Sequence, residues 1–296
     1  TYFQAMRTDP QINKILTIQD VEYGSREGFV ADPFVVMEDN NHHMFFEIFY
    51  RNPREKVVGS AKRTYGSEWE YKGIAIKNEG REYSFPYTFQ HNSEWYMLPA
   101  IANTNGTRPP LTLYKSVDFP LEWTVESEFD IKGGDPVVFQ WNGIWYLLCN
   151  SSDAVKVYFS ENLVSNDWAE HPTQSLNLES GLTRMGGRPA SIDGSLYLMY
   201  QDGKCHYGEK VRCYRVTKLD CEDFQQSEIS SSPIVSGQYN QSWNHLGMHH
   251  VDFNLSSDFV IVDGHNTDGW SIGMASCKCS SAPTRLTPSP SEFNIT

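Results

Sequence analysis

The chain has 296 residues, of which 39% are hydrophobic and 14% aromatic, enough to bury a sizeable core within one domain. Its formal net charge of −13 argues against nucleic acid as a partner, because phosphate backbones are bound through Lys and Arg. No apolar run approaches the roughly 20 residues that a membrane-spanning helix requires, so we expect no transmembrane segment.

The N-terminal stretch divides into two parts. Tyr2-Phe3-Gln4 resembles the remnant of a protease-cleavable tag, and residues 1–6 are therefore left out of the fold. Residues 12–18 alternate between apolar and polar side chains, which predicts a strand. The last seventeen residues, 280–296, form a Ser- and Pro-rich tail, so the folded domain is expected over residues 7–279.

From residue 29 onward one motif recurs. A Pro is followed by a short apolar or aromatic run, a polar turn and a second aromatic run. The four prolines are spaced by 53, 50 and 53 residues: Pro33, Pro86, Pro136 and Pro189. A degenerate fifth copy begins at His249. Self-similarity at about 50 residues in a β-patterned chain is typical of propeller blades. The sequence therefore predicts an all-β, five-bladed propeller, with the strand at 12–18 completing the last blade and closing the ring.

The residue before each proline is a candidate for the wall of the central channel, which the first strand of every blade lines in a propeller. These residues are Asp32, Phe85, Asp135, Arg188 and, in the degenerate copy, His249. Carboxylates, a guanidinium, an imidazole and an aromatic ring together suit a sugar ligand. A structural alternative stays open for each: Asp-Pro is a common turn-to-strand dipeptide, Arg188 could simply neutralise the aspartates, and His249 could be a structural histidine.

The two Asp-Pro openings resemble those of five-bladed propeller glycoside hydrolases of the arabinanase, β-xylosidase and invertase kind. The resemblance implies that Asp32 is the general base or nucleophile and that Asp135 tunes or orients. That family carries a general-acid Glu at the start of blade four, where this chain has Gly187-Arg188-Pro189. Ordinary glycoside hydrolysis needs two carboxyl groups, so another acid would be required. The candidates are His249, Asp202, Glu47 and Glu209.

A more specific resemblance covers about residues 12–275. It is to the propeller domain that precedes the transferase domain in plant glucosamine inositolphosphorylceramide transferases. The motifs that carry it include Leu16-Thr-Ile-Gln-Asp-Val21, Phe29-Val-Ala-Asp-Pro-Phe34, Tyr96-Met-Leu-Pro99, Gly186-Gly-Arg-Pro189, Gln201-Asp202, Tyr207-Gly208 and His249-His-Val-Asp252. The chain departs from that family at Ala100, where a Glu is usual, and near Ser84, where a His is usual. The resemblance implies the fold and a carbohydrate setting. It does not imply transferase activity, because glycosyl transfer in that family is attributed to a separate downstream domain.

Two functions follow from these patterns. The first is a glycoside-hydrolase-like protein acting on a glycan in a central pocket, by an inverting mechanism with Asp32 as base. The alternative is a non-catalytic carbohydrate-binding or accessory propeller domain associated with glycosyl transfer; a protein-interaction propeller explains the paired Asp-Pro motifs less well. The expected substrate-binding residues are Phe85, Arg188, Gln201, His250 and Asp252. We expect no cofactor, and leave open a structural calcium ion in the channel near His249.

Five Asn-X-Ser/Thr sequons, at Asn105, Asn150, Asn240, Asn254 and Asn294, favour a secreted or lumenal, N-glycosylated protein of the secretory pathway. The six cysteines are an even number, which fits some disulfides in an oxidising compartment. Cys205 and Cys213 bracket a predicted hairpin and are the first expected pair. Cys277-Lys-Cys279 lacks a second ligand pair for zinc.

Overall fold

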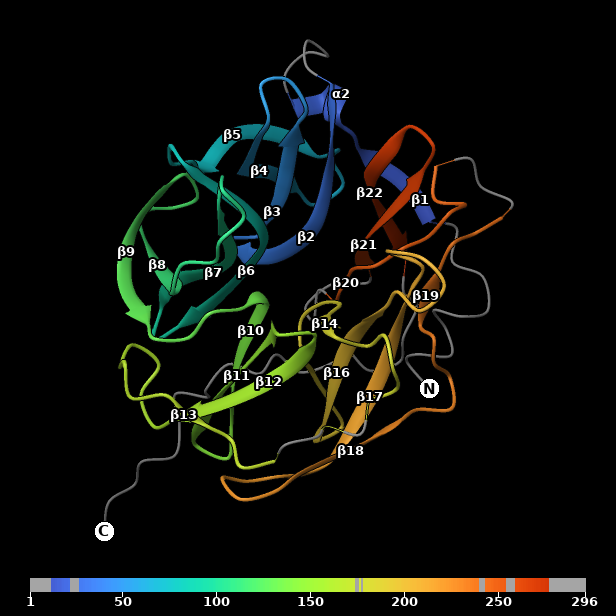
Figure 1. Ribbon diagram of the computed structural model, residues 1–296. Helices are drawn as coiled ribbons and strands as arrows, with labels where there is room; N and C mark the ends of the chain where they lie inside the picture. Colours follow the sequence, from blue (N-terminus) through green and yellow to red (C-terminus); the bar gives the residue numbers. More distant parts are fainter. Residues whose placement is uncertain are drawn as a thin grey trace.

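The protein is a ring of five β-sheets around a central axis (Figure 1). The computed structural model describes residues 12–21, 27–173, 176, 178–239, 243–253 and 259–276. The expected tag remnant at 1–6 and the tail at 280–296 lie outside these residues. Each sheet is a blade whose first strand faces the axis, so the predicted all-β five-bladed propeller is confirmed.

The first three blades are regular four-stranded antiparallel sheets in sequence order. Blade one contains β2 (Gly28–Glu38), β3 (Asn41–Tyr50), β4 (Glu55–Thr64) and β5 (Glu70–Ile76). Blade two contains β6 (Arg81–His91), β7 (Glu94–Asn103), β8 (Leu111–Asp118) and β9 (Glu122–Phe129). Blade three contains β10 (Gly134–Trp141), β11 (Ile144–Ser151), β12 (Ala154–Ser160) and β13 (Ala169–Glu170).

The last two blades are less regular. Blade four has an interrupted inner edge, with β14 (Arg184–Met185) and β15 (Ala190–Ile192) both pairing with β16 (Ser195–Asp202). It continues through β17 (Lys210–Leu219), β18 (Phe224–Glu228) and β19 (Val235–Ser236). Blade five contains β20 (Val251–Phe253), β21 (Phe259–Asn266) and β22 (Gly269–Ser276).

The N-terminal strand β1 (Ile12–Leu16) supplies the outer strand of blade five, where it pairs antiparallel with β22 and places Ile12 opposite Ala275. The predicted ring closure is therefore confirmed. The strand ends earlier than expected because a short helix, α2 (Ile18–Val21), begins there. Thr17 caps it: its backbone N–H and its hydroxyl both donate to Asp20. Within the described part of the chain no helix is long and apolar enough to cross a membrane.

The cores lie between neighbouring blades, where apolar side chains of adjacent sheets pack face to face. The aromatic pairs of the second strands, Trp95-Tyr96 and Trp145-Tyr146, are buried there. The expected Cys205–Cys213 disulfide is wrong. Cys213 points into the core of blade four, Cys205 is exposed in the loop before β17, and both thiols are free. Cys277 and Cys279 lie outside the described residues.

Candidate functional site at the channel mouth

The first strands of blades one, two and three each contain a bulge at the residue before proline. Pairing with the second strand shifts between Ala31 and Phe34 in blade one, and at the equivalent places in β6 and β10. The residues at these bulges are Asp32, Phe85 and Asp135, with φ of 52°, 48° and 47°. Left-handed backbone at a non-glycine residue is uncommon, and outside a hairpin turn it suggests a functional constraint. The bulges redirect these three side chains to one central cluster.

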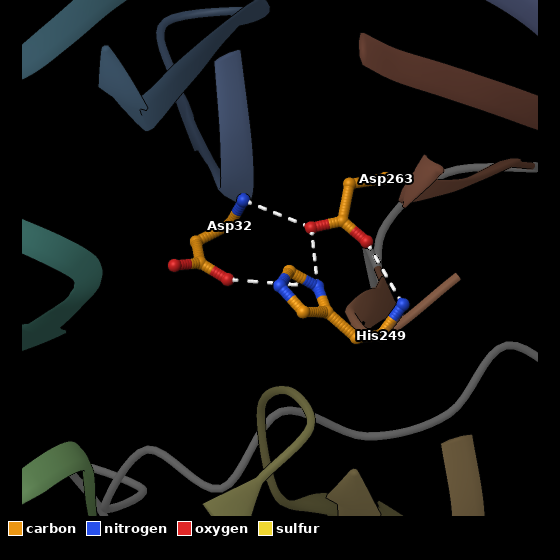
Figure 2. A group of neighbouring side chains, drawn as sticks. All are labelled: Asp32, His249 and Asp263. Atoms are coloured by element: carbon orange, nitrogen blue, oxygen red, sulfur yellow. Dashed lines mark hydrogen bonds and ion pairs between the residues drawn. The ribbon is translucent and has the colours of Figure 1, made fainter. Parts of the chain in front are cut away.

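Asp32 meets two residues of blade five in the centre of the ring (Figure 2). Its backbone N–H donates to Asp263 Oδ2 at 3.1 Å, and its Oδ1 lies 3.9 Å from His249 Nδ1. His249 Nδ1 is 2.8 Å from Asp263 Oδ2, and the backbone N–H of His249 donates to Asp263 Oδ1. Asp32 Oδ2 accepts from the N–H of Phe85, whereas the buried Oδ1 has no hydrogen-bond partner.

Burial and neighbouring charge set the protonation of this group. Burial raises the pKa of Asp32 to about 8, against the attraction of His249, and Glu47 adds to the rise. Burial alone would lower the pKa of His249, but the charge of Asp263 and its hydrogen bond raise it. Burial would likewise raise the pKa of Asp263, and His249 lowers it. At neutral pH Asp32 therefore keeps its proton, next to a His249 whose pKa Asp263 raises.

Two aromatic residues cover His249. The indole of Trp270 stacks on its ring with centroids 3.9 Å apart, and the hydroxyl of Tyr207 lies 3.1 Å from its Nε2. Tyr207 is 55% exposed, and the guanidinium of Arg184 lies 5.4 Å from its ring centroid. We call Tyr207, Trp270, Arg184 and the Asp32–His249–Asp263 group the channel mouth. It combines one exposed aromatic residue, Tyr207, with buried polar groups.

Asp135 is held in place by Arg184 from blade four. The guanidinium binds both carboxylate oxygens, with Nε donating to Oδ2 at 2.5 Å and Nη2 donating to Oδ1 at 3.1 Å. Gln201 Nε2 also donates to Asp135, at 3.3 Å, and to the carbonyl of Met185. The sequence had suggested Arg188 as the neutralising partner of the aspartates, and this is wrong. The partner of Asp135 is Arg184.

Arg188 instead crosses the ring below the channel mouth. Gly187 has φ of 151°, and a Cβ there would lie 1.9 Å from the carbonyl oxygen of Val251, so the backbone packs directly on blade five. The Arg188 Nε then donates to Asp252 at 2.7 Å and its Nη1 to the carbonyl of Thr88. Asp252 also accepts from the N–H of Val35. Arg188 and Asp252 thus join blades one, two, four and five and close the axis.

The five expected substrate-binding residues are therefore all buried: Phe85, Arg188, Gln201, His250 and Asp252. The ring of His250 lies edge-on between Phe34 and Phe85, and burial lowers its pKa to about 4. These residues support the channel mouth from below and have almost no exposed surface for a ligand.

The alternative acids lie in ion pairs. Glu47 is buried and contacts Lys56 Nζ at 2.7 Å. Burial alone would raise the pKa of Asp202, but the hydrogen bond from Arg212 lowers it, and Lys210 lowers that of Glu209 in the same way. With their pKa values lowered, Asp202 and Glu209 have no proton to donate at neutral pH. His249, the remaining candidate, contacts Asp32 directly.

One group of described residues could hold a metal ion. Asp32, His249 and Asp263 each offer a ligand atom, and these atoms lie within 4.8 Å of one another. Carboxylate oxygens suit calcium, and a histidine among them suits a transition metal as well. The calcium site left open by the sequence would be found here, and it stays a prediction.

Three residues of the channel mouth were missed in the sequence: Asp263, Arg184 and Trp270. Asp263 had a readable signal, because it is the charged residue in the otherwise apolar run Phe259-Val-Ile-Val-Asp-Gly264. Arg184 precedes the Gly-Gly-Arg-Pro motif by two residues, and only the interrupted inner edge of blade four brings it to Asp135. Trp270 follows a turn, and nothing in the sequence distinguishes it from the other aromatic residues of the strands.

Comparison with known proteins agrees with this architecture. The catalytic domain of Coprinopsis cinerea GH62 α-L-arabinofuranosidase superposes with a TM-score of 0.68 at 12% identity, over 91% of this chain and 97% of that one. At this identity the likeness shows the fold alone, which is that of glycoside-hydrolase propellers.

Relatives in sequence lie among plant enzymes. Glucosamine inositolphosphorylceramide transferase 1 of Oryza sativa subsp. japonica is 30% identical over 256 residues, covering 82% of this chain and 34% of that protein. The Arabidopsis thaliana protein of the same name is 30% identical over 271 residues, covering 86% and 35%. The chain thus spans about a third of the length of these relatives. Residues 4–265 match the family model described as glucosamine inositolphosphorylceramide transferase 1, N-terminal, and the chain belongs to this family.

Proposed function

We propose that the propeller binds a glycan at the channel mouth and acts as a non-catalytic carbohydrate-binding domain associated with glycosyl transfer. The observation that carries this proposal is Tyr207, a residue that is 55% exposed and lies beside Arg184 and the buried His249. An aromatic face takes up the apolar face of a sugar ring, and a few polar groups beside it fix the hydroxyls. The relatives are named for glucosamine and an inositolphosphoryl headgroup, which fits a glycan ligand.

The protonation of the site favours binding over cleavage. An inverting glycosidase needs an ionised base and a protonated acid on opposite sides of the bond. With a pKa of about 8, Asp32 keeps its proton at neutral pH and cannot serve as the ionised base. Asp135, which the hydrolase hypothesis assigns to orientation, is occupied by Arg184. The hydrolase-like fold keeps cleavage as the second candidate.

The test is calorimetric titration with glucosamine, arabinose and myo-inositol 1-phosphate, each against the wild type and Tyr207→Ala. We expect at least one sugar to bind and the variant to weaken it about tenfold or more. Tyr65→Ala is the control, because Tyr65 is 87% exposed and lies in the turn after β4, away from the channel mouth. If no sugar binds, or if both variants behave alike, the proposal fails.

A second assay separates binding from cleavage. Aryl-glycosides and plant cell-wall polysaccharides are incubated with the protein and with Asp32→Asn, and released sugar is measured. We expect no release from either protein. Release that disappears in Asp32→Asn would reject the non-catalytic proposal in favour of a hydrolase.

We place the domain in the lumen of the secretory pathway, with N-linked glycans on its surface. Asn105 lies in an exposed turn, where its Oδ1 accepts hydrogen bonds from the N–H and hydroxyl of Thr107. Asn150 differs, because its amide nitrogen donates to the carbonyl of Thr183 at 2.7 Å. Among the two described sequons, only Asn105 thus presents its amide for modification. The other three, at Asn240, Asn254 and Asn294, lie outside the described residues.

A further inference from the structure

A cavity of about 500 Å³ lies at the seam between blade five and blade one, where β1 closes the ring. We call it the seam cavity. Its walls come from the β1–α2 junction, from the start of β2 with the residue after β3, and from the turn between β21 and β22. The lining residues used below are Lys14, Gln19, Arg51, Trp243, Asp268 and Trp270. Its volume falls within the roughly 300–1,000 Å³ typical of small-molecule sites.

The seam cavity and the channel mouth lie at the same end of the propeller. β20 begins just after His249 and His250, and β21 runs antiparallel to it, so the turn after Asn266 returns to that end. Gly28, at the start of β2, also lines the cavity. A ligand bound at one site can therefore extend toward the other across one face.

Trp270 is shared by both sites. Its ring stacks on His249 of the channel mouth, while the same residue lines the seam cavity. The indole of Trp270 packs directly on the backbone of Gly208, where a Cβ would lie only 2.4 Å from its Cη2. This close contact holds the indole in position. Trp243 is seated similarly against Gly273. Aromatic groups held in place before binding lower the ordering cost of binding.

The composition of the seam cavity suits a sugar. Apart from Ile18, two glycines and the two tryptophans, every lining residue has a polar or charged side chain. Cations (Lys14, Arg51) and a carboxylate (Asp268) are present together with the amide of Gln19, so the walls offer both donors and acceptors. Sugar hydroxyls can pair with these groups, whereas an apolar ligand offers them no hydrogen bond.

We propose that the ligand is an oligosaccharide of at least two sugars, with one at the channel mouth and the next units passing Trp270 into the seam cavity. This inference rests on the proposed function and names the substrate class more closely. The seam cavity is a second subsite, and its contribution appears as a gain in affinity with chain length.

The experiment titrates the protein with two length series: glucosamine to its β-1,4-linked trimer, and arabinose to arabinotriose. For the series that binds, we expect the trimer to bind about tenfold or more tighter than the monosaccharide. Gln19→Trp fills the cavity, and Arg51→Ala removes one lining side chain. Each variant should cancel this gain and leave the monosaccharide affinity unchanged.

Arg54→Ala is the matched control, since Arg54 is on the same blade, is exposed, and pairs with Glu82 outside the cavity. Melting temperatures of all three variants verify that they fold. A monosaccharide that binds with no gain along the series, or a gain that survives Gln19→Trp, overturns the second subsite and leaves the proposed function intact. Absence of binding by any sugar rejects both. Loss of monosaccharide binding in Gln19→Trp but not in Tyr207→Ala also overturns the proposal.

Discussion

Replacing Asp32 by Asn should stabilise the protein at neutral pH, although it changes a residue at the centre of the ring. Asn tolerates the left-handed backbone that Asp32 adopts, and its side-chain oxygen can still accept from the N–H of Phe85. It removes a group whose pKa burial raises from 3.8 to about 8.

The sign follows from proton binding. Between about pH 4 and pH 8 the folded protein holds a proton on Asp32 that the unfolded chain has released, so stability falls as pH rises through this window. His249, whose pKa is also raised, acts in the same direction: its contribution is present at low pH and is lost as pH rises through its folded pKa. Each pKa unit corresponds to about 1.4 kcal/mol, so the roughly three units between 3.8 and pH 7 give a cost for Asp32 of at most about 4 kcal/mol. Burial of the Asn amide in the same site costs part of this, and we expect a gain of about 2 kcal/mol for Asp32→Asn.

The assay is urea denaturation of wild type and variant at intervals from pH 4 to pH 8. The difference in unfolding free energy should be near zero at pH 4 and should grow steadily toward pH 8. Asp135→Asn is the control at the matching bulge, and it should destabilise the protein, because Arg184 loses its charged partner. The reasoning would be refuted if Asp32→Asn were less stable than wild type at pH 7. It would also be refuted if the difference in unfolding free energy became smaller as the pH rises.

Three further outcomes are expected. Arg188→Met should lower the unfolding free energy by roughly 3–5 kcal/mol in urea titrations, because it leaves Asp252 charged and buried without its cation; pairing it with Asp252→Asn should recover much of the loss. Removal of the chain through Leu16 should lower the melting temperature by roughly 10 °C and cause self-association in light scattering, since β22 becomes an open edge. In a secretory expression host, Asn105→Gln should reduce the mass by one glycan while Asn150→Gln should not change it, and the reverse result would contradict the hydrogen bond assigned to Asn150.

The ring, its five blades and its closure could be read from the sequence, because the repeated Pro motif and the alternating apolar residues reflect local geometry. The bulge residues Asp32 and Asp135 could be found for the same reason: each stands before a proline at the start of an inner strand. Their chemistry could not be predicted from the sequence. The pKa of Asp32 depends on burial, which follows only from the packing of all five blades.

Blade four departs from the arrangement that the repeated motif predicts. The motif placed Arg188 in line with the other channel residues, but Gly187 turns the backbone onto blade five and sends the guanidinium to Asp252. The partner of Asp135 then comes from Arg184, in a short strand that has no counterpart in the repeat. The pairings between blades depend on where each strand is interrupted. The spacing of the prolines does not predict these interruptions.

The ion pair of Arg188 and Asp252 also determines how a polymer can meet this molecule. With the axis blocked, a chain cannot be threaded through the ring, and whatever enters at Tyr207 must leave by the same opening. A long glycan would then be held by its terminus or by a side branch and not along its middle. Under the proposed function, such a domain would distinguish the ends and branches of a glycan chain from its unbranched middle.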